Sequence, residues 1–228
     1  MRDFKLWLKQ EKNGLKNDFY SYPKRNFLFL ILGVAVLLLA LFRLWTVISV
    51  ESVFYGDNLI VKQIEILRTS FGDNFFLLVT NLGSAYFILG AFLILAIFLV
   101  KKKRKKAAVA VFLTLAGSAF LIYLFKNLFS RPRPFGCLNL NDCFSFPSGH
   151  TTIAVYFYGL LFHLTTRFLK LKKRTVYVLG LLIGLIIILV ALSRIYLGFH
   201  FLTDVVGGFL LGSVLLLVAA ILIDFLYQ

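Results

Sequence analysis

The segment SRIYLGFHFLTD, from Ser193 to Asp204, joins two strongly apolar stretches of the chain, residues 175–192 and 205–226. It brings a hydroxyl, a guanidinium, an imidazole and a carboxylate together within twelve residues. Such groups are costly near a bilayer, so their clustering is a functional-site hypothesis. If the segment is helical, His200 and Asp204 share one face, and the carboxylate can hold the imidazole in one tautomer. The segment therefore predicts a membrane hairpin that presents an activated histidine, with Arg194 beside it for an anion.

The composition is that of a membrane protein. The chain has 228 residues, of which 60% are hydrophobic, and its mean hydropathy is +0.89. An ordinary soluble domain is about 45–50% apolar. We expect a polar N-terminal segment over residues 1–25 and one membrane domain over 26–228, with no cleavable signal peptide. Residues 4–20 fit either a short amphipathic helix on the membrane surface or a flexible tail.

Apolar stretches long enough to cross a bilayer recur along the chain, since a spanning helix needs about 20 mostly apolar residues. Six windows qualify: 26–48, 75–100, 107–125, 151–169, 175–192 and 205–226. The connection 49–74 is too polar to span, but Ile60, Ile64 and Leu67 recur in it at helical spacing. It predicts a short interfacial helix. The fold class is therefore all-α, a polytopic membrane protein with six transmembrane helices in one bundle.

Basic residues set the expected topology. Of the 25 Lys and Arg residues, 18 fall in three clusters: residues 1–25, 101–106 and 167–174. The positive-inside rule assigns all three clusters to the cytoplasm, together with both termini. The outer connections are then 49–74, 126–150 and 193–204. The net charge of +15 does not indicate a nucleic-acid partner, because the charge flanks apolar spans, where it contacts anionic lipid head groups.

The outer connection 126–150 supplies a second group of chemically active residues. Three cations occur in it: Lys126, Arg131 and Arg133. It ends in PSGH, where Ser148 and Gly149 stand at the start of the fourth span and His150 follows. Backbone N–H groups at a helix N-terminus bind anions. Because this connection and residues 193–204 are both expected outside, the two groups can converge.

The combined inventory favours phosphoryl chemistry without a metal or other cofactor. Asp142 is the only acidic residue between Asp73 and Asp204, which argues against a magnesium or zinc site. Fixed cations can instead neutralise the phosphoryl oxygens, and two histidines can act as nucleophile and acid. A phosphatase is the main prediction. A phosphotransferase with the same site and a non-enzymatic anion or lipid transporter are the alternatives.

Three spaced motifs resemble the signature of the type 2 phosphatidic acid phosphatase superfamily. They are Lys126 with six residues to Arg133-Pro134, then Pro147-Ser148-Gly149-His150, then Ser193-Arg194 with five residues to His200 and three more to Asp204. The six-span layout also resembles the membrane members of that family. Vanadium haloperoxidases resemble the same signature, but they are soluble chains, so the six spans argue against that activity.

The resemblance implies a division of roles. His200 would attack phosphorus and form a phosphohistidine, Asp204 would orient His200, and His150 would protonate the leaving group and then activate water. The phosphate-binding residues would be Lys126, Arg133, Ser148, Gly149 and Arg194. Arg131 has no position in the signature, and Ser193 matches it with either a site role or a helix-capping role.

The resemblance also implies a lipid phosphate as substrate. Its candidates are phosphatidic acid, phosphatidylglycerol phosphate, undecaprenyl diphosphate and a lipid A phosphate, and the sequence does not choose among them or indicate an oligomeric state. We expect a bacterial inner membrane location with the active site on the outer face. There, Cys137 and Cys143 are predicted to form a disulfide, with two free thiols as the alternative.

A few residues outside the motifs carry structural expectations. Small residues at three places predict close helix packing: Asn81 to Ser84, Gly180 with Gly184, and Gly208 with Gly212. His163 and Asp224 fall near cytoplasmic ends of spans. They are therefore expected at the interface, away from the catalytic cluster.

Overall fold

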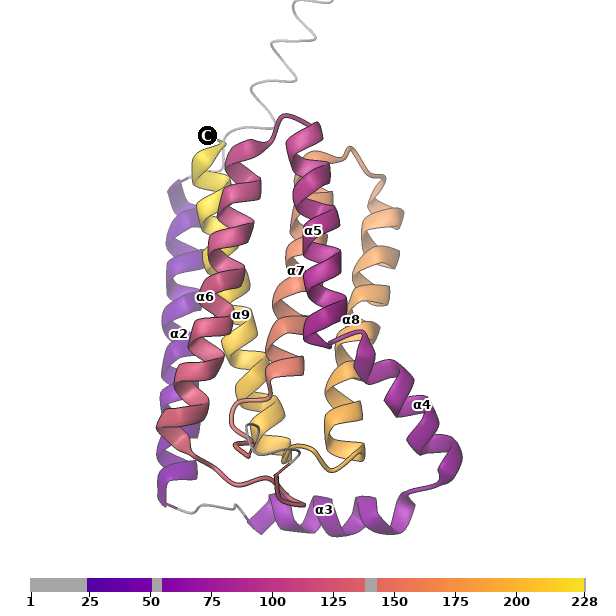
Figure 1. Ribbon diagram of the computed structural model, residues 1–228. Helices are drawn as coiled ribbons and strands as arrows, with labels where there is room; N and C mark the ends of the chain where they lie inside the picture. Colours follow the sequence, from indigo (N-terminus) through magenta and orange to yellow (C-terminus); the bar gives the residue numbers. More distant parts are fainter. Residues whose placement is uncertain (1–23, 51–54, 138–142, 228) are drawn as a thin grey trace, which may run out of the picture.

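The computed structural model describes residues 24–50, 55–137 and 143–227, which form a bundle of long helices (Figure 1). The expected helix or tail at residues 4–20 lies outside the described residues. The helices are α2 (Lys24–Val50), α3 (Tyr55–Leu67), α4 (Ser70–Asn81), α5 (Ala85–Lys101), α6 (Lys105–Phe129), α7 (Gly149–Phe168), α8 (Lys173–Tyr196) and α9 (Leu202–Leu226). The all-α prediction is confirmed.

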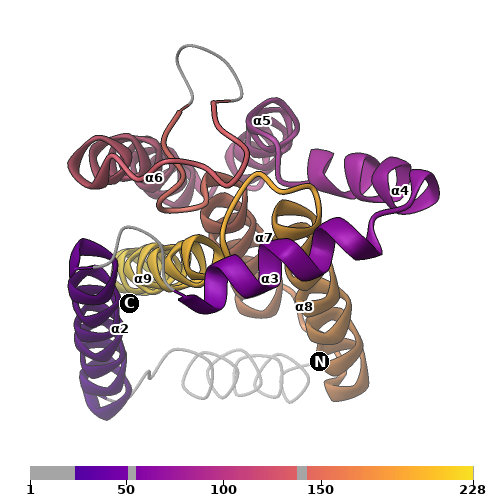
Figure 2. The same ribbon diagram turned by 90° about the horizontal axis from the view of Figure 1, so that it is seen from below.

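The expected spans correspond to long helices of the bundle. In the described chain, five segments are long and apolar enough to cross a membrane: Leu30–Ile48, Ser70–Lys101, Lys105–Phe129, Lys173–Tyr196 and Leu202–Leu226. The sixth expected span is α7, which is less apolar and lies in the middle of the bundle (Figure 2). Its polar groups are bonded inside the protein, since the Tyr156 hydroxyl pairs with Thr114 on α6 and Tyr158 donates to the Leu82 carbonyl at 2.9 Å. A helix surrounded by protein does not need a uniformly apolar surface.

Helices α7 and α9 form the centre of the bundle and contact each other more extensively than any other pair. A Cβ on Gly208 would lie 2.7 Å from the Ser148 carbonyl oxygen, and one on Gly212 would lie 2.6 Å from that of Thr152. Both distances are too short for a real Cβ, so the close approach depends on the two glycines. The packing predicted for this pair is confirmed.

The packing predicted for Gly180 and Gly184 is wrong. Both lie on α8, where a Cβ on Gly180 would make only an ordinary contact with Phe162 and one on Gly184 would meet nothing within 4 Å. Only 11% of the spanning window of α8 is buried, which shows that most of this helix faces outward. Glycines on such a face do not support a close helix contact.

The second expected span, 75–100, is not one straight helix. It is interrupted at Leu82–Ser84, where Ser84 accepts a hydrogen bond from the N–H of Phe87 and caps α5. Beyond the break, α4 leans away from the axis of α5 (Figure 1). Gly83 lets the turn pack closely, since a Cβ there would lie 2.6 Å from Val190 and 3.3 Å from the carbonyl oxygen of His150. The break therefore sits directly against the start of α7.

The predicted interfacial helix is present as α3. It lies across one end of the bundle, beneath the ends of α7, α8 and α9 (Figure 2), and contacts α8 and α9. We call this end the α3 end. The connection between α6 and α7 also lies there. Its two arms are joined by a bridge between Pro132 and Phe144 and by the disulfide predicted between Cys137 and Cys143, which is formed.

The basic turns lie at the opposite end of the bundle, where α5 meets α6 and α7 meets α8 (Figure 1). His163 and Asp224 lie near that end as predicted. Asp224 pairs with Arg167 at 3.1 Å and stands 3.5 Å from His163. This cluster links α7 to α9 at that end and is separate from the α3 end.

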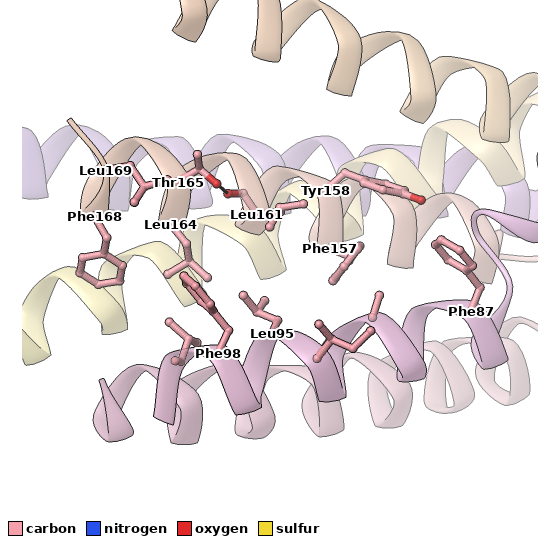
Figure 3. A pocket seen from close by; sticks show the side chains of 13 residues that line it. Phe87, Leu95, Phe98, Phe157, Tyr158, Leu161, Leu164, Thr165, Phe168 and Leu169 are labelled. Carbon is pink, nitrogen blue, oxygen red and sulfur yellow. Dashed lines mark hydrogen bonds between the residues drawn. The ribbon is translucent and has the colours of Figure 1, made fainter. Parts of the chain in front are cut away.

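An apolar groove runs between α5 and α7 (Figure 3). It encloses about 540 Å³ and is lined by side chains from Phe87 to Leu99 on α5 and from Phe157 to Leu169 at the other wall. None of the predicted site residues lines it. The groove is therefore separate from the predicted site.

Candidate active site

The sequence-predicted site residues all come from elements that meet at the α3 end. They are Lys126 in the last turn of α6, Arg133 in the following connection, Ser148, Gly149 and His150 at the start of α7, Arg194 in the last turn of α8, His200 in the α8–α9 loop and Asp204 in the first turn of α9. The bundle thus brings together groups separated by up to 78 positions in the sequence. Convergence of this kind is what the alternating topology predicts.

The α8–α9 loop holds His200 by its backbone. The N–H groups of Phe199 and His200 both donate to the Arg194 carbonyl, at 3.1 and 3.2 Å, so the loop folds back onto the end of α8. Gly198 makes this turn possible with a φ of 70°, which is costly for other residues. Its lack of a side chain also admits Phe135, whose ring would lie 2.0 Å from a Cβ. His200 is consequently fixed and buried, with 2% of its surface exposed.

Asp204 stands behind His200. Its Oδ2 atom lies 3.6 Å from Nδ1 of His200 and accepts a hydrogen bond from the N–H of Phe201 at 2.9 Å. The carboxylate favours a proton on Nδ1, which leaves the lone pair of Nε2 available for attack. This is the orientation that a histidine nucleophile needs.

The opposite nitrogen of His200 faces a cation. Nη1 of Arg133 lies 3.3 Å from Nε2 of His200 and donates to the Phe199 carbonyl at 2.6 Å. Burial lowers the pKa of His200 to about 4, although Asp204 raises it, and the charges of Arg194 and Arg133 lower it further. The imidazole is therefore neutral at physiological pH and able to act as a nucleophile.

The start of α7 brings His150 to the same place. The electrostatic neighbours of His150 are Arg194, His200, Lys126 and Arg133. Ser148 is the N-cap residue of α7, and its N–H donates to the Asp204 carbonyl at 3.0 Å. This bond ties the start of α7 to the start of α9, which carries the carboxylate. The second motif, which contains Ser148, and the third motif, which contains Asp204, are thus joined by a backbone hydrogen bond.

Three further signature positions have defined surroundings. A Cβ on Gly149 would make only an ordinary 3.6 Å contact with Ile122, so no crowding within the protein demands glycine there. Arg194 is buried, donates to the Thr80 hydroxyl at 2.7 Å and stacks over Phe199. The Ser193 hydroxyl donates to the Val190 carbonyl at 2.6 Å. Ser193 therefore bonds back into its own helix and does not cap it.

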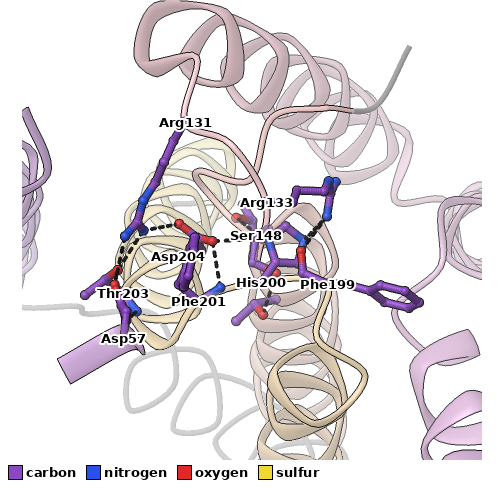
Figure 4. Close-up of polar contacts among 11 residues, drawn as sticks. Asp57, Arg131, Arg133, Ser148, Phe199, His200, Phe201, Thr203 and Asp204 are labelled. Carbon is purple, nitrogen blue, oxygen red and sulfur yellow. Dashed lines mark hydrogen bonds and ion pairs between the residues drawn. The ribbon is translucent and has the colours of Figure 1, made fainter. Parts of the chain in front are cut away.

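Sequence reasoning missed a buried network beside these residues (Figure 4). Arg131 bonds to Asp57 of α3, to Thr203 and to Asp204. Thr80 of α4, the partner of Arg194, was also missed. Asp57 and Thr80 lie 74 and 114 positions from their arginine partners. No local pattern links residues so far apart, although the position of Arg131, two residues before the signature arginine Arg133, was a partial signal.

Metal-ligand groupings are absent from the described part of the chain. Within residues 24–50, 55–137 and 143–227, no group of three or more His, Cys, Asp or Glu side chains is arranged to hold a metal ion. The convergent groups are cations and imidazoles, which suit a phosphate oxyanion.

Comparisons with known proteins agree with this geometry. The family model described as the PAP2 superfamily matches residues 107–227. The phosphatidylglycerophosphatase B of Bacillus subtilis (strain 168) is 31% identical over 172 residues, which cover 74% of this chain and 83% of that protein.

Two solved structures are similar. The crystal structure of a transmembrane PAP2-type phosphatidylglycerolphosphate phosphatase from Bacillus subtilis matches with a TM-score of 0.74 and 29% identity, over 82% of this chain and 93% of that one. The crystal structure of LpxE from Aquifex aeolicus matches with a TM-score of 0.53 and 26% identity, over 74% of this chain and 97% of that one. The chain therefore belongs to the PAP2 superfamily, as a membrane-bound phosphatase with a helical bundle fold.

Proposed function

We propose that this enzyme hydrolyses the phosphate monoester or diphosphate of a membrane lipid through a phosphohistidine on His200. The observation that carries the proposal is the surrounding of His200, with Asp204 at Nδ1 and Arg133 at Nε2. One carboxylate orients the ring, and one cation stands where a phosphoryl oxygen would approach the attacking nitrogen. This combination suits attack on phosphorus better than binding alone.

The proposed first step transfers the phosphoryl group to the enzyme. Nε2 of His200 forms a bond to phosphorus while the bond from phosphorus to the leaving oxygen breaks, and His150 donates the proton that this oxygen takes up. Asp204 stabilises the positive charge that the imidazole gains. The equatorial oxygens are bound by Lys126, Arg133, Arg194, the Ser148 hydroxyl and the Gly149 N–H.

The second step releases phosphate. His150, now unprotonated, takes a proton from water, and the resulting hydroxide attacks phosphorus as the bond to Nε2 breaks. The products are inorganic phosphate and the lipid alcohol or monophosphate, and both histidines return to their initial states. No metal ion or organic cofactor takes part in either step.

Among lipid phosphates, we propose phosphatidylglycerol phosphate as the first substrate to test. Its support is the name of the Bacillus subtilis relative, which matches most of both chains. Phosphatidic acid, undecaprenyl diphosphate and a lipid A phosphate follow. The bundle carries its basic turns at the end opposite the site, which supports an extracytoplasmic active site in a bacterial inner membrane.

A phosphate-release assay tests the function. Purified enzyme in detergent micelles is given each of the four lipids in the presence of EDTA, and free phosphate is measured. We expect turnover that EDTA does not reduce. Transfer of phosphate to a lipid or sugar acceptor without release would indicate a phosphotransferase. Lipid movement in vesicles without any bond cleavage would indicate a transporter, and loss of turnover in EDTA would contradict the metal-free mechanism.

A further inference from the structure

Helix α3 carries a buried carboxylate at the α3 end of the bundle. Asp57, in the first turn of α3, has 1% of its surface exposed. It accepts hydrogen bonds from the backbone N–H of Thr203 at 3.1 Å and from the Thr203 hydroxyl. A buried carboxylate is strongly destabilising unless it is paired, so the position of Asp57 requires an explanation.

Arg131 links this carboxylate to Asp204. Nη2 of Arg131 lies 2.8 Å from Oδ2 of Asp57, and Nη1 pairs with Oδ1 of Asp204 (Figure 4). The guanidinium lies over the ring of Phe201 at 4.5 Å and is 2% exposed. Its planar fork therefore holds two carboxylates in a fixed geometry, as guanidinium groups do.

The link determines how Asp204 faces His200. Because Oδ1 of Asp204 is bound to Arg131, the other oxygen, Oδ2, is the one turned towards Nδ1 of His200. The N–H of Phe201 bonds the same Oδ2 from the backbone. The carboxylate is therefore held from both sides, and Arg131 supplies the side-chain part of that support.

The charges of the network have a consequence for catalysis. Arg131 alone beside Asp204 would cancel the negative charge that stabilises a cationic His200. With Asp57 on the far side of Arg131, two carboxylates share one guanidinium and a net charge of −1 remains behind the imidazole. Low-dielectric surroundings make such a difference large.

We infer that Asp57 and Arg131 are positioning residues of the phosphatase, which orient Asp204 and keep a net negative charge behind His200. The inference rests on the proposed role of His200 as nucleophile. Asp57 lies outside residues 107–227, which the family model matches, and Arg131 is not a signature position. Other charged or titratable groups that face His200 are Asp204 on α9, Arg194 on α8, Arg133 after α6 and His150 on α7.

Charge balance makes an unusual prediction about two variants of the full-length enzyme. Asp57→Asn leaves a neutral Arg131–Asp204 pair, and we expect kcat for phosphatidylglycerol phosphate to fall about 10–100-fold, the size of the loss when outer partners of metal-binding histidines are removed. KM should change little, and the acid limb of kcat/KM should move to lower pH. The double variant D57N/R131Q removes both charges and leaves Asp204 with its own. It should recover activity relative to D57N and return the acid limb towards that of the unmodified enzyme.

A merely structural role for the network predicts the reverse order. The double variant would then be no more active than D57N, and the remaining activity of D57N would keep the pH profile of the unmodified enzyme. Either result overturns the inference. Asp73→Asn is the matched control, because it breaks an exposed pair with Arg68 at 3.0 Å in the neighbouring helix. It should leave kcat and pH profile unchanged.

Two further measurements make the test decisive. Thermal unfolding of each variant in detergent reports whether D57N folds, and the double variant, which removes the charges of Asp57 and Arg131 together, serves if D57N does not. His200→Ala, assayed in parallel, separates the two hypotheses. If it retains turnover, the proposed function is wrong. If it is inactive while D57N has normal kcat, only the inference about Asp57 and Arg131 is wrong.

Discussion

Nη1 of Arg133 lies 3.3 Å from Nε2 of His200. An oxygen bound to this guanidinium would bring its phosphorus close to Nε2, so the proposed anion clamp and the proposed nucleophile form one unit. The Phe199 carbonyl, which accepts from the same Nη1, holds the arginine in place before any substrate arrives. Such preorganisation is the main way in which an enzyme without a metal stabilises a phosphoryl transition state.

Replacement of His200 tests the nucleophile. We expect His200→Ala to lower phosphate release by about 10⁴-fold or more, as removal of other catalytic nucleophiles does. The measurement is initial rate with phosphatidylglycerol phosphate, with thermal unfolding to show that the variant folds. His163→Gln is the control, because His163 lies at the far end of the bundle beside Asp224, and it should retain full turnover. Undiminished turnover in His200→Ala would show that another group attacks phosphorus.

The pH dependence of kcat/KM tests the environment of His200. The nucleophile must be unprotonated, and burial lowers its pKa to about 4. Activity governed by this group should therefore persist below the ordinary histidine value of about 6.5 and fall as pH approaches about 4. A limb set by the lipid phosphate itself, near pH 6, would change between a monoester and a diphosphate substrate. A His200 limb near or above the ordinary value would contradict the structure.

The same lowered pKa affects stability, so the acid measurement needs its own control. Between about pH 4 and 6.5 the unfolded chain binds a proton at His200 more readily than the folded chain. This group therefore makes the free energy of unfolding decrease as pH is lowered through that window. Samples held at each pH and then assayed near neutrality should regain full activity, which separates reversible titration from acid unfolding.

Gly208→Ala tests the spacing of α7 and α9. The new methyl group would lie 2.7 Å from the Ser148 carbonyl oxygen, which is backbone and cannot rotate away. Overpacking of this kind costs about 1–3 kcal/mol, and it displaces the residues that carry the second motif. We expect a lower unfolding temperature together with reduced kcat. Gly184→Ala is the matched control because a Cβ there meets nothing within 4 Å; an equal loss in both variants would refute the argument.

Thr80→Val tests the support of Arg194. The substitution keeps the shape of the side chain but removes the hydroxyl that accepts from Nη1 of Arg194 at 2.7 Å. Hydrogen bonds to charged groups contribute about 1.5–3 kcal/mol, so we expect kcat/KM to fall by roughly tenfold or more. Thr46→Val, which removes a hydroxyl bonded within α2, should have no effect. Steady-state kinetics of the two variants provide the comparison.

The architecture was largely predictable because it depends on local sequence. Window hydropathy gave the spans, and the period of Ile60, Ile64 and Leu67 gave α3. The break between α4 and α5 was missed, because Asn81 to Ser84 was interpreted only as a packing site. Gly83 followed by the capping hydroxyl of Ser84 was the available signal.

The site was predictable only in part. Motif spacing brought together the residues that carry the family signature, and the topology explained how they converge. Asp57 and Thr80 could not be found in the same way, because an aspartate in the first turn of an amphipathic helix usually faces water. Only the packing of α3 across the bundle makes Asp57 a buried partner of Arg131. Burial and long-range pairing are properties of the assembled fold.

The disulfide between Cys137 and Cys143 can report the orientation in which the chain was inserted into the membrane. Disulfides persist in oxidising compartments and not in the cytosol, and both cysteines belong to the connection at the α3 end. In a molecule inserted in the proposed orientation, the two cysteines are disulfide-bonded and therefore resist alkylation. In an inverted molecule, they are free thiols and react. Mass spectrometry after alkylation without reductant would count the two populations directly, with no tag or fused reporter. A bundle with its basic turns at one end can thus be checked for orientation at the other.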